Sequence, residues 1–292
     1  MYSQIDKNRL LSVFLLLGFL IFAILVSWFL SYLVSQDIIS SVFVSFISFG
    51  ISVLVSLVTY FYGDKFVLFS TGSIDVTDNP AFNHLNKTVE ILSIKAGIPR
   101  PRIYIIPDPA LNAFATGRNP QNSHVAITQG LYERMNQQEL EGVIAHELAH
   151  IKNFDIRLML IVSVFASAIT YIADFFIRVI SGSDEDTPPW LIFIGILVAI
   201  LSPIIATLIQ LAISRRREYL ADFTAVEITR YPQGLISALR KLQADDLPVS
   251  KATEGNAHMF IDFPLKRTHS FFANLFSTHP PIEDRIAALE RL

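Results

Sequence analysis

Residues 143–154 read V-I-A-H-E-L-A-H-I-K-N-F, and this stretch determines how the rest of the chain is interpreted. His146 and His150 are four positions apart, so on a helix their side chains project from the same face. Two neutral imidazoles at that separation can share one zinc ion. Glu147 lies beside them, where a carboxylate can take a proton from an attacking water. The alternative is a helix with two surface histidines and a solvated glutamate.

The composition limits what could complete such a site. The chain has 292 residues, of which 52% are hydrophobic and 17% charged. Soluble domains carry about a quarter charged residues, so this composition indicates a membrane protein. The absence of cysteine from the sequence excludes disulfides, thiolate zinc sites and a cysteine nucleophile, so His, Asp or Glu must hold any zinc. The net charge of −3 and the lack of a basic stripe favour no nucleic-acid partner.

The segments that precede the histidines predict a small α+β region. Asn136, followed three residues later by Glu139, has the pattern of a capping box and would begin the histidine helix. Another helix is expected over 81–96, with Gly97 as its stop. Short β-branched stretches bounded by turn residues predict strands over 103–106, 111–116 and 124–128.

Four hydrophobic runs are long enough to cross a membrane as helices. They cover residues 10–35, 38–62, 158–180 and 190–214. The first two predict a transmembrane hairpin; the first is too long for the core of a cleaved signal peptide, and the second follows at once. The third run contains Asp174 and Arg178 and is the least certain span. The last two runs could instead pack on the soluble part without crossing.

The basic residues predict the orientation of these spans. If all four runs cross, one side of the membrane receives Lys7, Arg9, Lys65, Lys152, Arg157 and Arg215 to Arg217. The two opposite loops, 36–37 and 181–189, contain no Lys or Arg. By the positive-inside rule, both termini and the polar middle of the chain are therefore expected in the cytoplasm.

A catalytic zinc usually has three protein ligands, so a carboxylate on the same side of the membrane is needed. Glu218 and Asp222 follow the fourth run and are four positions apart, so both can face the histidine helix. We assign Glu218 as the third ligand and Asp222 as the group that orients a ligand imidazole through its other nitrogen. The alternative is a solvated acidic pair beside an arginine cluster.

With these motifs in place, the sequence resembles the HtpX-type membrane zinc metalloproteases, relatives of the CaaX-prenyl proteases. The resemblance covers nearly the whole chain. It rests on N-A-F-A-T-G at 112–117, H-E-L-A-H-I-K-N at 146–153, R-R-R-E-Y-L-A-D at 215–222 and F-S-T-H-P-P-I-E-D-R-I at 276–286. The third ligand of that family is the first Glu of an E-x-x-x-D pattern, which agrees with Glu218.

The resemblance implies further site residues. Asn112, Ala113, Phe114 and Ala115 resemble the edge strand on which zinc proteases bind an extended substrate backbone; the alternative is an ordinary strand. His279 and Arg285 match a C-terminal H-P-x-x-x-x-R element, whose members would assist catalysis by stabilising the oxyanion. The alternative is that these two residues only begin the last helix and lie on its surface.

The expected fold is a predominantly helical α+β integral membrane protein with four hydrophobic segments and a cytoplasmic, gluzincin-type zincin domain that carries a small sheet. We expect a transmembrane hairpin over 1–65, two halves of the protease domain over 66–157 and 215–292, and the third and fourth hydrophobic segments over 158–214.

The expected function is zinc-dependent hydrolysis of peptide bonds, with one Zn²⁺ per chain and no covalent acyl intermediate. By resemblance, the substrates are membrane or misfolded proteins at the cytoplasmic face of a bacterial inner membrane, in quality control and stress response. A variant is cleavage of lipidated peptides. Two other classes stay open: a membrane-bound scaffold or binding protein with a structural zinc, and a small transporter, which would place polar residues deep in several spans.

Overall fold

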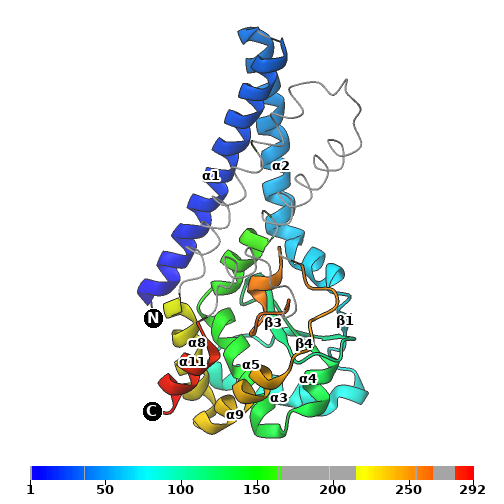
Figure 1. Ribbon diagram of the computed structural model, residues 1–292, viewed down its shortest axis with the longest axis vertical. Coiled ribbons are helices and arrows are strands. Elements are labelled where there is room, and N and C mark those ends of the chain that lie inside the picture. The colour runs from blue at the N-terminus through cyan, green and yellow to red at the C-terminus, as the bar shows by residue number, and fades with distance from the viewer. Residues whose placement is uncertain are drawn as a thin grey trace.

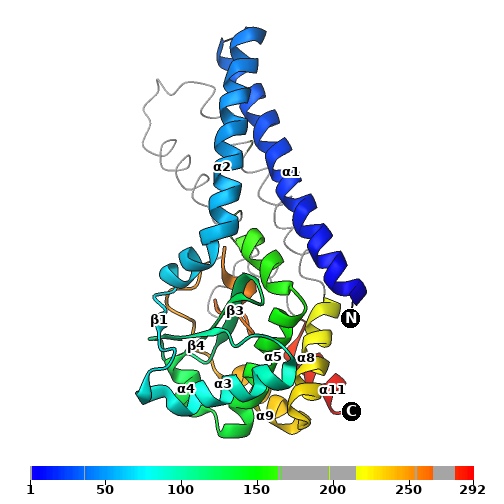
Figure 2. The ribbon, with the colours of Figure 1, turned by 180° about the vertical axis from the view of Figure 1, so that it is seen from behind.

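The computed structural model of the protein describes residues 2–35, 37–163, 165, 197, 215–253, 255–265 and 280–292. Two long helices project from a rounded part that contains the sheet and the remaining helices (Figure 1). They are α1 (Tyr2–Ser35) and α2 (Ile38–Ser70), which lie side by side in opposite directions in both views (Figures 1 and 2). Asp37 caps α2, since its carboxylate accepts a hydrogen bond from the Ser40 amide at 2.8 Å.

The hairpin presents an apolar surface to its surroundings. Large side chains such as Phe14, Ile39, Phe46 and Leu54 are exposed along it. The helix α2 is long and apolar enough to cross a membrane, with a stretch of mean hydropathy 2.4 of which only 11% is buried within the protein. Such an apolar surface is favourable against the hydrocarbon of a bilayer and unfavourable in contact with water. Of the third and fourth predicted spans, only residues 158–163, 165 and 197 are described, and the rest lie outside the described residues.

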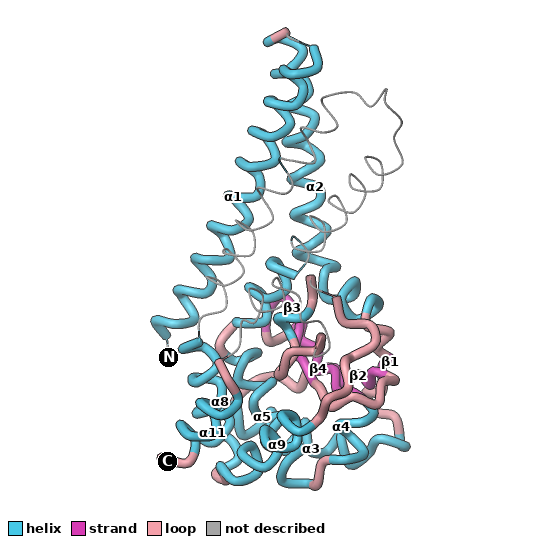
Figure 3. The backbone as a smooth tube through the Cα atoms, in the orientation of Figure 1, coloured by secondary structure: helices cyan, strands magenta, loops and turns pink. Residues whose placement is uncertain are grey.

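The sheet is small and mixed. It has four strands in the order β1-β2-β4-β3, and strand β3 lies at one edge. Strands β2 and β4 pair in parallel, and the other two pairings are antiparallel. The bounds of the strands are β1 (Ile74–Asp75), β2 (Arg102–Ile106), β3 (Ala113–Asn119) and β4 (Asn122–Thr128). Figure 3 shows these strands lying against helices.

Helix α5 (Gln137–Lys152) is the centre of the rounded part. It contacts strands β3 and β4 and the helices α3 (Asn83–Ala96), α8 (Arg215–Thr229) and α9 (Pro232–Ala244). Apolar residues from all these elements form one continuous core. Every residue of α5 from Gly142 to Ile151 is buried, so the side chains in this part of the helix are shielded from water.

Two glycines let α5 and α9 approach closely. A Cβ on Gly142 would come within 2.7 Å of the Leu235 backbone nitrogen, and one on Gly234 within 2.4 Å of the Gln138 carbonyl oxygen. The cost of Gly142 to helix propensity is therefore offset by packing. The shorter elements are η1 (Pro80–Phe82), α4 (Gln129–Arg134), η2 (Ala257–Met259) and α11 (Ile282–Leu289).

Candidate active site

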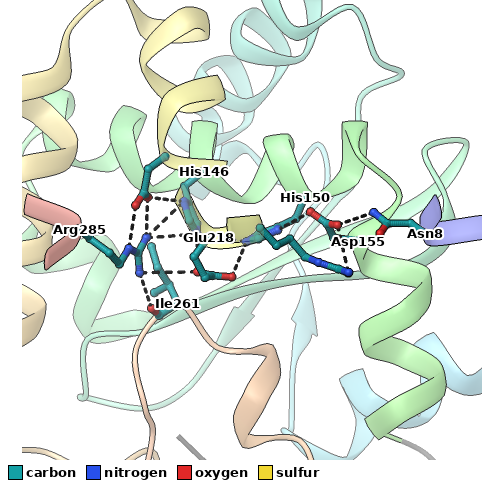
Figure 4. A network of polar contacts seen from close by, with 9 residues as sticks. Asn8, His146, His150, Asp155, Glu218, Ile261 and Arg285 are labelled. Carbon is teal, nitrogen blue, oxygen red and sulfur yellow. Dashed lines mark hydrogen bonds and ion pairs between the residues drawn. The ribbon is translucent and has the colours of Figure 1, made fainter. Parts of the chain in front are cut away.

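Helices α5 and α8 bring three predicted metal ligands together. His146 and His150 project from α5, and Glu218 projects from the first turn of α8 (Figure 4). All three side chains are buried. The two Nε2 atoms are 3.1 Å apart; His146 Nε2 lies 3.6 Å from Oε2 of Glu218, and His150 Nε2 lies 3.6 Å from Oε1 of the same carboxylate. Three donor atoms therefore converge on one point.

A carboxylate orients each imidazole through its other nitrogen. Asp222 Oδ1 lies 2.9 Å from His146 Nδ1, and Asp155 Oδ2 lies 3.0 Å from His150 Nδ1. An Nδ1–H that donates to a carboxylate leaves the Nε2 lone pair of a neutral ring available for a metal. Asp222 thus contacts His146 as an orienting carboxylate would, and Asp155 makes the equivalent contact with His150.

The donor set fits a zinc ion. Zinc–ligand bonds of about 2.0–2.1 Å at tetrahedral angles separate ligand atoms by about 3.3 Å. The two Nε2 atoms are 3.1 Å apart, and each has one Glu218 oxygen at 3.6 Å, Oε2 for His146 and Oε1 for His150. Two imidazole nitrogens that face each other also need a cation or a proton between them. His146, His150 and Glu218 offer one ligand atom each, so a fourth position would stay open for water or substrate.

The surrounding charges act on the two histidines in opposite directions. Burial and the positive charge of Arg285 lower the pKa of His146, so this ring is neutral. Burial also lowers the pKa of His150, but the carboxylates of Glu218, Asp155 and Glu147 together raise it above its usual value. Without a metal, these shifts favour one proton between the two Nε2 atoms, in addition to the Nδ1–H of each ring, and a divalent cation would replace that proton.

Arg285 lies behind the ligands. Its side chain is fully buried, with Nε and Nη2 donating to the two oxygens of Asp222 at 2.9 and 2.7 Å. Nη1 donates to the Ile261 carbonyl at 3.1 Å and lies 3.8 Å from the Glu218 carboxylate. Burial alone would raise the pKa of Asp222, but Arg285 and His146 lower it below its usual value. The described contacts thus place Arg285 on an orienting carboxylate.

Two residues of this network escape prediction from the sequence. Arg217 forms an ion pair with Asp155 at 3.2 Å, and Asn8 of α1 donates to the same carboxylate at 2.7 Å. Both side chains are buried. In the sequence, Arg217 is marked only as one of three basic residues that follow the fourth hydrophobic run. Nothing in the sequence around Asn8 marks it, because its role depends on a contact between distant segments.

The predicted substrate strand lies at the sheet edge, but its own chain covers part of it. The Ala113 carbonyl accepts a hydrogen bond from the Ile261 amide at 2.9 Å, and Phe114 forms an antiparallel bridge with Phe260. The Asn112 side chain donates to the Asp262 carbonyl at 3.0 Å. The sequence predicts unpaired backbone groups here, whereas residues 260–262 already pair with the first part of β3.

The position of Glu147 follows from its place between the two histidines on α5, and its side chain is buried. His279 lies outside the described residues. The structure therefore brings together Glu147, the three candidate ligands, Asp222 and Arg285, and it places Asn112 to Ala115 on the neighbouring strand.

The sequence itself decides the family. Residues 80–292 match the model of Peptidase family M48. The chain belongs to this family. It is 45% identical over 240 residues to a "Protease HtpX homolog" of Tropheryma whipplei (strain Twist), covering 80% of this chain and 81% of that protein. A protein with the same name from Limosilactobacillus reuteri (strain DSM 20016) is 39% identical over an alignment of 304 residues, covering 100% of both.

A solved structure shares the fold of the M48 chain. The crystal structure of S. mikatae Ste24p superposes with a TM-score of 0.52 at 17% identity, covering 99% of this chain and 67% of that one. Family membership confirms the prediction of a membrane metalloprotease, and it favours that prediction over a scaffold or a transporter. The M48 family also implies a metal, for which the three convergent ligands provide a place.

Proposed function

We propose that the protein is a zinc-dependent endopeptidase in which His146, His150 and Glu218 hold one Zn²⁺ and Glu147 is the general base. The observation that carries this proposal is the convergence of three buried donor atoms beside a fourth buried carboxylate. A structural zinc would normally be closed by a fourth protein ligand and would have no need of a base at this position.

Each side chain has a distinct task in this mechanism. When bound, zinc acts as a Lewis acid that polarises the scissile carbonyl and makes the water more acidic. Glu147 accepts the proton of the attacking water and passes it to the leaving amine. Asp222 and Asp155 hold the two imidazoles in the tautomer that presents Nε2. Arg285 positions Asp222, and we keep for His279 the predicted role of donating to the oxyanion.

We infer that substrates bind as an extended strand along β3. The exposed edge of a sheet captures a peptide backbone through its N–H and C=O groups, whatever the sequence of the peptide. Asn112 to Ala115 would supply these groups. Because residues 260–262 pair with Ala113 and Phe114, a substrate that uses the whole edge has to displace them.

The cellular setting is proposed from the hydrophobic runs and the charges. Four spans, with the protease domain divided into 66–157 and 215–292, would put the active site and both termini on the cytoplasmic side of a bacterial inner membrane. A site at that position would meet membrane proteins and misfolded chains. We therefore propose quality control of membrane proteins as the role, with the bilayer and polypeptide substrates as partners.

The test compares wild type with Glu147→Gln. Both proteins are purified in detergent with a chelator, an unfolded test protein is added, and fragments are followed by intact mass before and after Zn²⁺ is supplied. We expect fragments from the wild type only, and only after zinc is added. Zinc content should be one per chain in both proteins, because Glu147 is not a ligand.

The matched control is Glu141→Gln, which neutralises a carboxylate on the same helix, at a position that is not buried. This variant should cleave like the wild type. Cleavage by Glu147→Gln at the wild-type rate would contradict the mechanism. Equal activity after Mn²⁺ or Co²⁺, with no gain from Zn²⁺, would contradict the choice of metal.

A further inference from the structure

The amino-terminal end of the hairpin reaches the metal centre through one side chain. Asn8 lies in the second turn of α1, and its side chain is buried against the end of α5 (Figure 4). Its Nδ2 atom donates to Asp155 Oδ1 at 2.7 Å and to the Asn153 carbonyl at 2.9 Å. A carboxamide nitrogen carries two hydrogens, so it can make both bonds at once.

The two bonds of Asn8 fix the turn that presents Asp155. Asn153 is the C-cap of α5, and Phe154 has a φ of 60°, a left-handed conformation that a bulky residue rarely adopts. The Asn153 carbonyl and the Asp155 carboxylate lie on either side of this residue. By bonding to both, Asn8 holds the strained turn in the form that directs Asp155 to His150.

The two orienting carboxylates are held in different ways. Arg285 donates two hydrogen bonds to Asp222, so one side chain fixes both oxygens. In Asp155, Oδ2 faces His150, while Oδ1 receives the hydrogen bond from Asn8 and an ion pair from Arg217 at 3.2 Å. Asn8 makes the shorter of the two contacts. Its loss would leave a buried carboxylate oxygen held by the longer contact alone.

We propose that Asn8 is a positioning residue of the metal site, which acts through Asp155 to hold the His150 imidazole in its ligand orientation. The first helix of the hairpin is then part of the metal centre as well as an anchor. This inference rests on the proposed function, because it takes His150 to be a metal ligand.

The test uses a variant that keeps the shape of the side chain and removes its donors, Asn8→Leu. The matched control is Ser12→Ala, one turn further along α1. Ser12 is also buried, and its hydroxyl donates to the Asn8 carbonyl within the helix, away from Asp155. The zinc dissociation constant of each purified full-length protein is measured by competition with a chromophoric chelator, and the visible spectrum of the Co²⁺ form reports ligand geometry.

We expect Asn8→Leu to weaken zinc binding about 10-fold and to change the Co²⁺ spectrum. This is the lower end of the effect of losing a group that bonds directly to a ligand imidazole, because Asn8 acts through Asp155. Ser12→Ala should match the wild type in both measurements. An affinity of Asn8→Leu within about twofold of Ser12→Ala would overturn the inference. If the wild type itself bound no zinc, the proposed function would fail instead, so the two failures are distinguishable.

A double-mutant cycle separates positioning from a general effect on the fold. In an Asp155→Asn background, Asn8→Leu should change zinc affinity less than about twofold, because its route to His150 is already broken. The same loss in both backgrounds would show that Asn8 acts by another route and would overturn the inference. Should Asn8→Leu not fold, Asn8→Ser, whose hydroxyl is too short to bond to both partners, takes its place with the same criteria.

Discussion

Arg285 is a fully buried cation whose charge is balanced by carboxylates inside the protein. It donates to both oxygens of Asp222 and lies 3.8 Å from Glu218. Removing one partner of a buried ion pair leaves an uncompensated charge, which costs about 3–5 kcal/mol. We therefore expect Arg285→Met to lower the free energy of unfolding of the metal-free protein by about this amount, measured by denaturant titration in detergent.

The exposed pair between Arg240 and Glu290 provides the control for this prediction. These side chains are 2.7 Å apart and 59% and 49% exposed. Since solvent screens such pairs, Arg240→Met should change the free energy of unfolding by less than about 1 kcal/mol. Equal losses in the two variants would mean that burial does not determine the contribution of Arg285.

At the same scale, the sequence locates the residues that a local pattern marks. The spacing of His146 and His150 places both on one helix face, and the pattern around Glu218 and its resemblance to known proteases place it opposite them. Asn8 lies in no such pattern, and the motif that contains Arg217 does not indicate its contact with Asp155. Their roles depend on where α1 and α8 contact the end of α5. These contacts join segments more than 60 residues apart, so the local sequence of neither segment predicts them.

At the scale of elements, the sequence predicts helix ends well because the causes of helix ends are local. The capping box of Asn136 and Glu139 is confirmed, and Gly97 is the left-handed C-cap of α3. The predicted strand 111–116 is shifted: β3 begins at Ala113 and continues to Asn119, with a bulge after Gly117 at a φ of 139°. The parallel pairing of β2 and β4 depends on tertiary contacts and has no local signal.

Glu139 gives the capping box a second role. Its carboxylate accepts hydrogen bonds from Lys241 at 2.6 Å and Ser237 at 2.7 Å, so it also joins α5 to α9. Burial alone would raise the pKa of Glu139, but these bonds and the Asn136 amide lower it below its usual value. The ionised form therefore stabilises the fold by about 1–2 kcal/mol, reduced from a fully buried pair because Lys241 is 42% exposed.

The sign of the pH dependence follows from the lowered pKa of Glu139. Its contribution is complete above the pKa of an unfolded glutamate, about 4.3, and is lost as the pH falls through the lower folded value. Glu139→Gln should thus be less stable than the wild type at pH 7, and the difference should shrink below about pH 4. Thermal unfolding from pH 7 to pH 3 measures this. A difference that does not change with pH would contradict the prediction.

At the scale of the whole molecule, the hairpin and the rounded part face different surroundings. The exposed surface of α1 and α2 is apolar over most of its length. The sheet and α3 to α5 instead carry ion pairs and helix-capping side chains, which are typical of a protein surface in water. Asn8 joins the base of this hairpin to the metal site. The membrane part is therefore expected to influence the metal site directly through this contact.

The proposed orientation can be tested with single cysteines, because the chain has none of its own. Ile39 lies at the tip of the hairpin and is 80% exposed, and Ile94 lies on α3 and is 74% exposed. The reagent is a maleimide that passes the outer layer of bacterial cells but not their inner membrane. If the active site is cytoplasmic, this maleimide should label Ile39→Cys in intact cells. It should label Ile94→Cys only after the inner membrane is opened. The reverse pattern would put the protease domain outside the cytoplasm, and labelling of both in intact cells would show that α2 does not separate two compartments.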